Sequence, residues 1–364
     1  MHIAFFGSSL LSSYWNGAAT YYRGIISALA RRGWRVTFYE PDAFDRQQHR
    51  DIDPPEWAEV VVFPATTKAM REVFSRANAA DVIVKASGIG VLDDEILAAT
   101  VSASGGRAVT AFWDVDAPAT LAEIDANAQH PLRAAVQKLD CVLTYGGGAP
   151  VAEAYRRVGA RQCIPIYNAL DPCTHFPVEP EPRFAVDLAF LGNRLPDREA
   201  RVDAFFFEAA RRLTDRKFLL AGAGWEPSRL PPNVAYIGHL PTSQHNAFNS
   251  SPLAVINISR ESMATTGFSP ATRVFEAAGA AACIITDGWE GIERFLAPGK
   301  EVLIADRAQD VVRILSTLTK ERAGDIGLRA RARVLSEHTY AQRAEIVEHV
   351  FRDLIQTRKV RALA

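Results

Sequence analysis

An arginine and a glutamate stand three residues apart in ATRVFEAAGAAACIITD, residues 271–287, a stretch whose pattern predicts a helix followed by a buried strand. Arg273 and Glu276 therefore share one face of that helix. A guanidinium group matches phosphate oxygens, and a carboxylate accepts hydrogen bonds from two adjacent hydroxyl groups. The pair fits the diphosphate and the ribose of a nucleotide, while the alanines would face the core. A surface ion pair at helical spacing is the alternative interpretation.

The start of the same helix offers a second contact for a phosphate. Ser269 followed by Pro270 predicts a helix that begins near residue 270, with the serine as its N-cap. The backbone amides around Thr266, Gly267 and Thr272 lie at this helix start, where the helix dipole favours an anion. We expect Ser269 and these three residues to contact the phosphate.

Two arginines follow an earlier predicted strand in FLGNRLPDREAR, residues 190–201. The turn Gly192-Asn193-Arg194 comes directly after the strand, and Arg198 lies four residues further on. Guanidinium groups at the carboxyl end of a strand are suited to a diphosphate. A solvated helix start, with the arginines beside acidic residues, is the alternative.

Glycine turns follow the next two predicted strands. In LLAGAGW, residues 219–225, Gly222 and Gly224 would let the backbone approach a ligand closely. In GHLP, residues 238–241, the backbone groups of His239 and Leu240 are expected to touch a base. Ordinary turns are the alternative in both places.

The composition is typical of a globular protein, and the nearly balanced charges produce no strong overall electrostatic field. The 364 residues are 48% hydrophobic and 23% charged, and the formal net charge is −1. A nearly neutral chain does not recruit nucleic acid through its overall charge. The four cysteines have no metal-ligand spacing, and the N-terminus resembles neither a signal peptide nor a membrane span. A cytoplasmic protein is expected, and the basic end RDLIQTRKVRALA allows a peripheral membrane contact or a solvated helix end.

Strands and helices alternate twice along the chain, which predicts two Rossmann-like, doubly wound parallel sheets of the α/β class. The first domain is expected at 1–176 and binds the acceptor. A proline-rich linker, PVEPEPRF, occupies 177–184. The second domain spans 185–339, and a helix from residue 340 to the C-terminus crosses back to the first domain. Ligands are expected at the carboxyl ends of the strands.

The chain resembles a known family over residues 187–305. The segments FLGNRLPDR, LLAGAGW, AYIGHLP, INISRES and ATRVFEAAGAAACIITDGWEGIERFLAPGKEVLIA are similar to the nucleotide-sugar-binding domain of GT-B glycosyltransferases, in particular the branch of the spore maturation protein CgeB. FWDVDAP and YGGGAPVAEAYRRVGA extend the resemblance loosely into the first half.

The resemblance implies transfer of a hexose from a nucleotide sugar, a UDP-sugar in the first place, with no tightly bound cofactor. Glu276 would bind the ribose, Arg194 and Arg198 the diphosphate, and the amides around Thr272 the phosphate. Many retaining enzymes of this fold carry an additional glutamate where this chain has Phe268, so the stereochemical outcome stays open. A non-catalytic nucleotide-sugar-binding protein and a sugar-nucleotide epimerase or hydrolase are the alternatives.

Two aspartates are the candidates for catalysis. Asp114 and Asp116 in FWDVDAP end a predicted strand of the first domain, where a carboxylate would take the proton of an acceptor hydroxyl. Their spacing also suits a metal ion, but the helix start and the arginines already compensate a diphosphate, so no metal is expected. A capping role at the next turn is the alternative. His175 and His239 are further possible bases.

Overall fold

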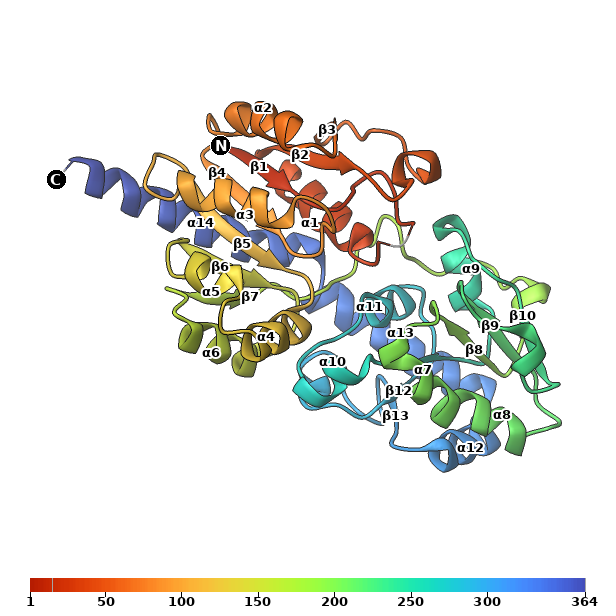
Figure 1. Cartoon of the computed structure of the whole chain (residues 1–364). Helices are drawn as coiled ribbons and strands as arrows, with labels where there is room; N and C mark the ends of the chain where they lie inside the picture. The colour runs from red at the N-terminus through yellow and green to blue at the C-terminus, as the bar shows by residue number, and fades with distance from the viewer. Residues whose placement is uncertain (15, 364) are drawn as a thin grey trace. The chain divides into compact units, whose positions relative to one another are not determined.

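The computed structural model describes residues 1–14 and 16–363. The chain forms two compact units, which are described here one by one (Figure 1). Unit 1 comprises Met1–Tyr167 and Tyr340–Ala364, and unit 2 comprises Asn168–Thr339. Residues 168–184, which include the expected linker, are counted with unit 2. Within unit 2 the backbone amide of Val178 bonds Ser250 Oγ, and the ring of Phe184 packs on Phe248.

Unit 1 is built on a parallel sheet whose described strands run in the order β3-β2-β1-β4-β5-β6-β7. Helices cover both faces of a sheet of this kind, so its strands are continuous apolar runs. β1 and β4 have every residue buried apart from His2. The strands are β1 His2–Phe6, β2 Arg35–Asp42, β3 Glu59–Pro64, β4 Val82–Ala86, β5 Val109–Asp114, β6 Cys141–Thr144 and β7 Cys163–Pro165.

The helices of unit 1 connect successive strands and bury their apolar stripes on the sheet. One core contains Phe6 and Phe74, and another contains Phe112 and Tyr155. The helices are α1 Ala19–Arg31, α2 Thr67–Ala77, α3 Asp93–Ala103, α4 Ala117–Ala126, α5 Pro131–Val136 and α6 Gly148–Val158, with a short 3-10 turn at Arg46–His49.

Unit 2 repeats this architecture around a second parallel sheet, in which the described strands have the order β10-β9-β8-β11-β12-β13. The two doubly wound sheets confirm the predicted fold class. The strands are β8 Leu188–Leu191, β9 Phe218–Ala221, β10 Val234–Tyr236, β11 Ala254–Asn257, β12 Ile284–Asp287 and β13 Leu303–Ala305.

The helices of unit 2 pack on a core rich in aromatic rings. Phe206 and Phe218 meet edge to face, with ring centroids 5.4 Å apart. The helices are α7 Pro196–Val202, α8 Glu208–Arg212, α9 His245–Ser250, α10 Glu261–Thr266, α11 Thr272–Gly279, α12 Ala308–Thr317 and α13 Lys320–Glu337, with 3-10 turns at Pro182–Phe184, Pro227–Arg229, Thr242–Gln244 and Ile292–Arg294. The helices α7 and α8 are joined by a π-helical turn at Asp203–Phe207.

The last helix, α14 Tyr340–Leu363, belongs to unit 1, as predicted for the helix that crosses back. It packs on α1 (Figure 1). A Cβ atom on Gly24 of α1 would lie 2.2 Å from Tyr340 Cδ2, so only glycine allows this close approach. Further along, the rings of Trp34 and Phe351 are 6.1 Å apart.

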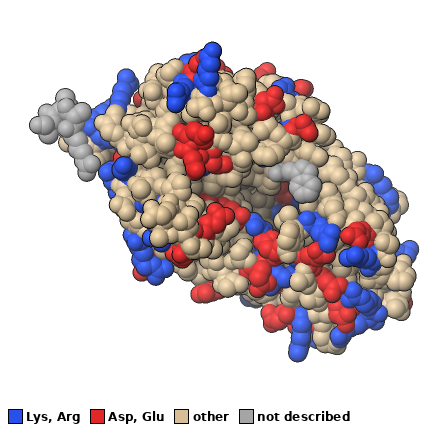
Figure 2. Space-filling model, in the orientation of Figure 1, with Lys and Arg blue, Asp and Glu red and all other residues tan. Residues whose placement is uncertain are grey.

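Basic and acidic residues are mixed on the face of the molecule that Figure 2 shows. Lysines and arginines are interspersed there with aspartates and glutamates, as the near-zero net charge leads one to expect. Among the described helices, none combines the length and the apolar composition that crossing a bilayer requires.

Candidate functional site

The strand order of unit 2 singles out one place in the sheet. The chain continues from β8 to β9 on one side, whereas β11 returns to pair with β8 on the other side. The loops that leave the carboxyl ends of β8 and β11 therefore diverge, and ligands of doubly wound sheets bind at such a point. The predicted nucleotide-binding residues are distributed over the loops at this edge.

The structure brings the predicted glycine turns together. Gly222 has a φ of +125°, and a Cβ atom there would lie 2.2 Å from the carbonyl oxygen of Gly192. The two loops are tied by a 2.8 Å hydrogen bond from the backbone amide of Ala223 to Asn193 Oδ1. Gly222 also donates its amide to the carbonyl of Gly238, at 2.7 Å. The loops after β8, β9 and β10 thus form one rigid backbone surface.

The side chains around that surface differ in exposure. Gly224 has a φ of +87° and lies against the side chain of Arg194. In the turn after β10, His239 is exposed and Leu240 is buried. The contact of the His239 and Leu240 backbone with a base stays a prediction.

Arg194 is already paired with acidic residues. Its Nε lies 2.9 Å from Glu199 Oε2 and its Nη1 lies 3.5 Å from Glu226 Oε1. The hydrogen bond and the charge of Glu199, with a smaller effect of Glu226, raise the pKa of Arg194. Its side chain is about one third exposed. Arg194 would have to share its charge between these carboxylates and a phosphate.

Arg198 lacks such a partner. It is half-buried, it donates from Nη2 to the carbonyl oxygen of Asn193, and its guanidinium lies 5.6 Å from the ring centre of Phe190. Within the described residues, no carboxylate lies within salt-bridge distance of it. Burial and the nearby charge of Arg273 lower the pKa of Arg198 to about 10. A desolvated cation beside a second cation attracts an anionic ligand.

The start of α11 differs from the prediction. The helix begins at Thr272, and its N-cap residue is Ala271, whose side chain makes no cap. Ser269 is not the N-cap, because its Oγ donates to the carbonyl of Gly267 at 2.9 Å. Pro270 does not start the helix either, since its carbonyl oxygen accepts a 3.0 Å hydrogen bond from Asn168 Nδ2.

Asn168 holds this helix start from both sides, and the sequence interpretation did not identify it. It is 1% exposed, and its Oδ1 accepts a 2.9 Å hydrogen bond from Thr272 Oγ1. With the threonine hydroxyl engaged and no side-chain cap, the first amides of α11 are open to a ligand. A helix N-terminus in this state suits a phosphate group.

The loop before α11 is locked by close packing. A Cβ atom on Gly267 would lie 2.8 Å from Glu290 Cβ, and Phe268 has a φ of +46°. The Phe268 ring packs beneath Arg294, 4.8 Å from its guanidinium carbon. Thr266 ends α10, and its hydroxyl donates back to the carbonyl of Ser262. The structure therefore places Thr266, Gly267 and Ser269 beside one another, with their backbone groups as the available contacts.

Glu276 is buried rather than exposed on a helical surface. It is 4% exposed, and its Oε2 lies 2.8 Å from Arg273 Nη1. His175 Nε2 lies 3.8 Å from Oε1, and His245 Nδ1 lies 3.9 Å from Oε2. Burial would raise the pKa of Glu276, but the charge of Arg273 and the two imidazoles outweigh it and lower the pKa to about 2. The carboxylate is therefore ionised at neutral pH.

Two histidines complete this cluster. His245 was not identified from the sequence, and burial together with Arg273 lowers its pKa to about 3. Arg273 Nη1 lies 3.3 Å from His245 Nδ1. His175, suggested as a base, is 3% exposed, and its Nε2 has no hydrogen-bond partner among the described residues. Ligand atoms of His175, His245 and Glu276 all lie within 4.8 Å of one another.

Asp114 and Asp116 lie in unit 1 at the junction of β5 and α4. Asp114 has no exposed surface, and burial raises its pKa. Its carboxylate accepts hydrogen bonds from Ser87 Oγ at 2.8 Å, Thr120 Oγ1 at 3.0 Å and the Asp116 amide at 3.0 Å, as well as from Tyr155 OH. Asp114 thus holds the first turn of α4, while the half-buried Asp116 occupies its N-cap position. Their catalytic roles stay predictions.

Solved structures identify the architecture of the whole chain as the GT-B fold, in which two doubly wound domains succeed one another. The chain is similar to sucrose-phosphate synthase of Thermosynechococcus elongatus, with 15% identity, a TM-score of 0.70, and coverage of 98% of this chain and 100% of that one. It is also similar to Anabaena HepE in complex with UDP and glucose, with 15% identity, a TM-score of 0.68, and coverage of 97% and 100%.

A viral enzyme has the same fold. BGT of phage T4 in complex with UDP-glucose has 12% identity, a TM-score of 0.59, and coverage of 98% of this chain and 99% of that one. The family model described as glycosyl transferase-like matches residues 198–349, which include most of unit 2 and the start of α14. No curated protein matches the chain in sequence.

Proposed function

We propose that the protein transfers a hexose from a UDP-sugar to an acceptor hydroxyl without a metal ion. The observation that carries this proposal is Arg198, a half-buried cation without a carboxylate partner among the described residues. It lies in the same unit as the uncapped start of α11 and the buried, ionised Glu276. A nucleoside diphosphate carries the charges and hydroxyl groups that these three features would bind.

The donor would be held by three contacts in unit 2. Arg198 and Arg273 would bind the diphosphate through charge-assisted hydrogen bonds, and the amides at Thr272 would bind the phosphate at the helix start. Glu276 would accept hydrogen bonds from the ribose hydroxyls. The glycine surface around Gly222 would allow the nucleotide to approach the backbone.

The chemistry would be a substitution at the anomeric carbon. The acceptor oxygen forms a bond to that carbon, the bond to the diphosphate oxygen breaks, and the diphosphate leaves with the electron pair. Fixed positive groups that face the leaving diphosphate stabilise the charge as it develops. The proton of the acceptor hydroxyl would pass to Asp116, the more exposed of the two candidate aspartates.

Metal independence is supported by the position of Arg273. His175, His245 and Glu276 could supply three ligand atoms to a cation. The guanidinium of Arg273 already lies 2.8 Å from Glu276 and 3.3 Å from His245. A divalent ion in this cluster would meet that positive charge at close range.

The finer family assignment also belongs to the proposal. The R-x-F-E and D-x-W-x-G-I-E patterns at 273–276 and 287–293 support the CgeB-like branch. A peripheral membrane contact of the basic C-terminal segment and a cytoplasmic location stay predictions of the sequence.

A non-catalytic nucleotide-sugar-binding protein is the second candidate. It is favoured by Phe268 in place of an acid and by the complete burial of Asp114. Both would leave unit 2 able to bind a nucleotide sugar while the chain lacks a reactive group.

Release of UDP from UDP-glucose and UDP-galactose, with mixed sugar and lipid acceptors, tests the proposal. The wild-type protein should release UDP in an acceptor-dependent manner, and Asp116→Asn should release it at least about 100-fold more slowly, the scale of general base catalysis, with unchanged UDP affinity. A UDP-sugar that binds but is never consumed would favour the binding protein. Release without an acceptor, or an epimerised sugar, would point to a hydrolase or an epimerase.

A further inference from the structure

A pocket lies at the amino ends of the strands of the unit 2 sheet, opposite the proposed donor site. Its volume is about 700 Å³, and all of its lining residues belong to unit 2. Asp187, Lys217, Leu253 and Cys283 each immediately precede a strand, namely β8, β9, β11 and β12. Because these strands are parallel, the four residues lie at the amino edge, whereas the proposed donor site occupies the carboxyl edge.

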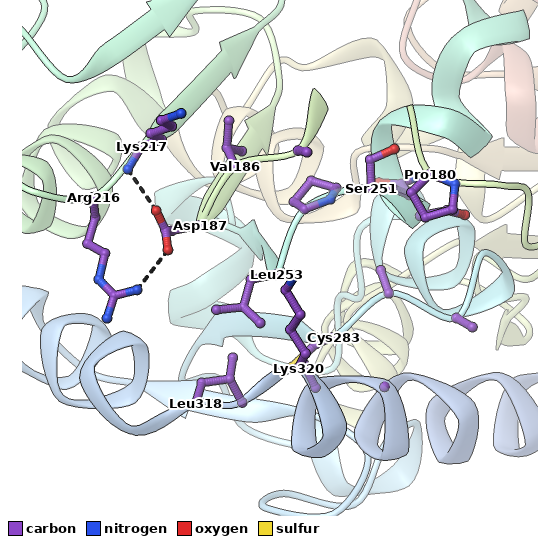
Figure 3. Close-up of a pocket in the computed structure, with 18 residues that line it drawn as sticks. Pro180, Val186, Asp187, Arg216, Lys217, Ser251, Leu253, Cys283, Leu318 and Lys320 are labelled. Carbon is purple, nitrogen blue, oxygen red and sulfur yellow. Dashed lines mark hydrogen bonds and ion pairs between the residues drawn. The ribbon is translucent and has the colours of Figure 1, made fainter. Parts of the chain in front are cut away.

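The pocket carries an excess of positive charge. Arg216, Lys217 and Lys320 are its basic residues, and Asp187 is its one carboxylate. Asp187 accepts a 2.9 Å hydrogen bond from Arg216 Nη1 and a 2.8 Å hydrogen bond from the backbone amide of Lys217. Figure 3 shows these contacts, with Lys320 on the helical side of the pocket beside Leu318.

The two ammonium groups remain available. In the described part of the chain, neither Lys217 Nζ nor Lys320 Nζ forms a hydrogen bond or an ion pair. Glu321 follows Lys320 but does not line the pocket. Two cations without ion-pair partners among the lining residues favour an anionic ligand.

The rest of the lining suits a small carbon skeleton with polar groups. Val186, Leu253 and Leu318 provide apolar walls. Asn249 also lines the pocket and is 1% exposed, and neither its Nδ2 nor its Oδ1 has a hydrogen-bond partner among the described residues. Buried amides of native proteins almost always have partners, so Asn249 marks a place where a ligand with both donor and acceptor groups would fit.

We propose that this pocket binds a phosphorylated small molecule, such as a sugar phosphate, separately from the donor site. Lys217 and Lys320 bind the phosphate group, and the hydroxyl-bearing skeleton lies against Leu253 and Asn249. The volume is within the usual range of ligand sites, roughly 300–1,000 Å³. This assignment does not depend on the proposed transferase activity, because it rests on a different edge of the sheet.

Calorimetric titration of the full chain with glucose 6-phosphate tests the proposal. The wild-type protein should bind it, and the double variant Lys217→Ala/Lys320→Ala should bind it at least about tenfold more weakly, since two charge-assisted contacts are lost. Lys68→Ala, which removes an exposed lysine of unit 1, is the matched control and should bind as the wild type does. Saturating UDP should leave the affinity unchanged.

Three results would overturn the proposal. One is the absence of binding of both glucose 6-phosphate and inorganic phosphate at millimolar concentrations. Another is equal binding by the double variant and the wild type. The third is equal affinity for glucose and glucose 6-phosphate, which would show that the phosphate is not recognised. If inorganic phosphate binds as tightly as glucose 6-phosphate, the skeleton does not contribute, and this part of the proposal is wrong.

Discussion

The buried charge of Arg198 should destabilise the protein without nucleotide and strengthen the binding of nucleotide. Its replacement by methionine should therefore stabilise the protein and weaken nucleotide binding. Its pKa falls from 12.5 to about 10, and at ~1.4 kcal/mol per pKa unit the buried charge costs roughly 3 kcal/mol in the folded state. Methionine fills a similar volume and loses the charge-assisted hydrogen bond to the Asn193 carbonyl, worth about 1.5–3 kcal/mol. Arg198→Met should therefore raise the free energy of unfolding by up to ~1.5 kcal/mol.

The same substitution removes a charge-assisted contact to the diphosphate. Such a contact contributes about 1.5–3 kcal/mol, so the Kd for UDP should rise roughly 10- to 100-fold. Urea denaturation without nucleotide measures the first effect, and calorimetric titration with UDP measures the second. Arg211→Met, at an arginine paired with Asp203 and Glu208 on the surface, should leave UDP binding unchanged. A less stable Arg198→Met protein, or one that binds UDP as the wild type does, would refute this reasoning.

Three further predictions concern the architecture around the site. His245 has its pKa lowered from 6.5 to about 3, so the unfolded state binds more protons and the stability falls as the pH drops below 6.5. In urea denaturation, His245→Gln should reduce the slope of the free energy of unfolding against pH by up to ~1.4 kcal/mol per pH unit between pH ~6 and ~4. Identical slopes for the variant and the wild type would contradict this. Gly24→Ala should destabilise the protein by ~1–3 kcal/mol through its clash with Tyr340, whereas Gly324→Ala, which has open space on α13, should be neutral or stabilising in the same thermal melts. Asn168→Ala removes the partner of two groups at the start of α11, and a buried polar group left without a partner costs ~1–3 kcal/mol. The loosened helix start should weaken UDP binding about tenfold, whereas an unchanged Kd would show that Asn168 has a purely structural role.

Local patterns predicted most of the architecture. Continuous apolar runs between turns predict eleven strands of the described chain, because a parallel sheet covered on both faces needs such runs. They correspond to β1, β2, β4, β5, β6 and the six strands β8 to β13. The strands β3 and β7 were not predicted. Glu59–Pro64 does contain the apolar run Val60–Phe63, so its pattern could have predicted this strand. Cys163–Pro165 has three residues and ends in proline, which leaves little pattern to recognise.

The sequence brought the loops of the candidate site together but did not reveal its long-range contacts. Gly192, Gly222 and Arg198 could be placed together because the carboxyl ends of neighbouring parallel strands meet at one edge. Asn168 and His245 could not, because their partners Thr272 and Glu276 lie far away in sequence.

Helical periodicity predicted only part of the environment of Glu276. The spacing indicated that it shares a face with Arg273, which the 2.8 Å contact confirms. The burial of that face depends on His175 and His245, which come from remote segments, so no local pattern could reveal it.

We propose that unit 2 binds a nucleoside diphosphate through Arg198 and Glu276. Calorimetric titration of the wild-type protein and Glu276→Gln with UDP, in the presence of EDTA and then of magnesium, tests it most directly. The wild type should bind UDP with a micromolar Kd that magnesium does not change. Glu276→Gln should lose at least about tenfold in affinity, because the ribose loses a charged acceptor. If UDP, GDP, dTDP and ADP all fail to bind, or if Glu276→Gln binds UDP as tightly as the wild type, the claim is contradicted.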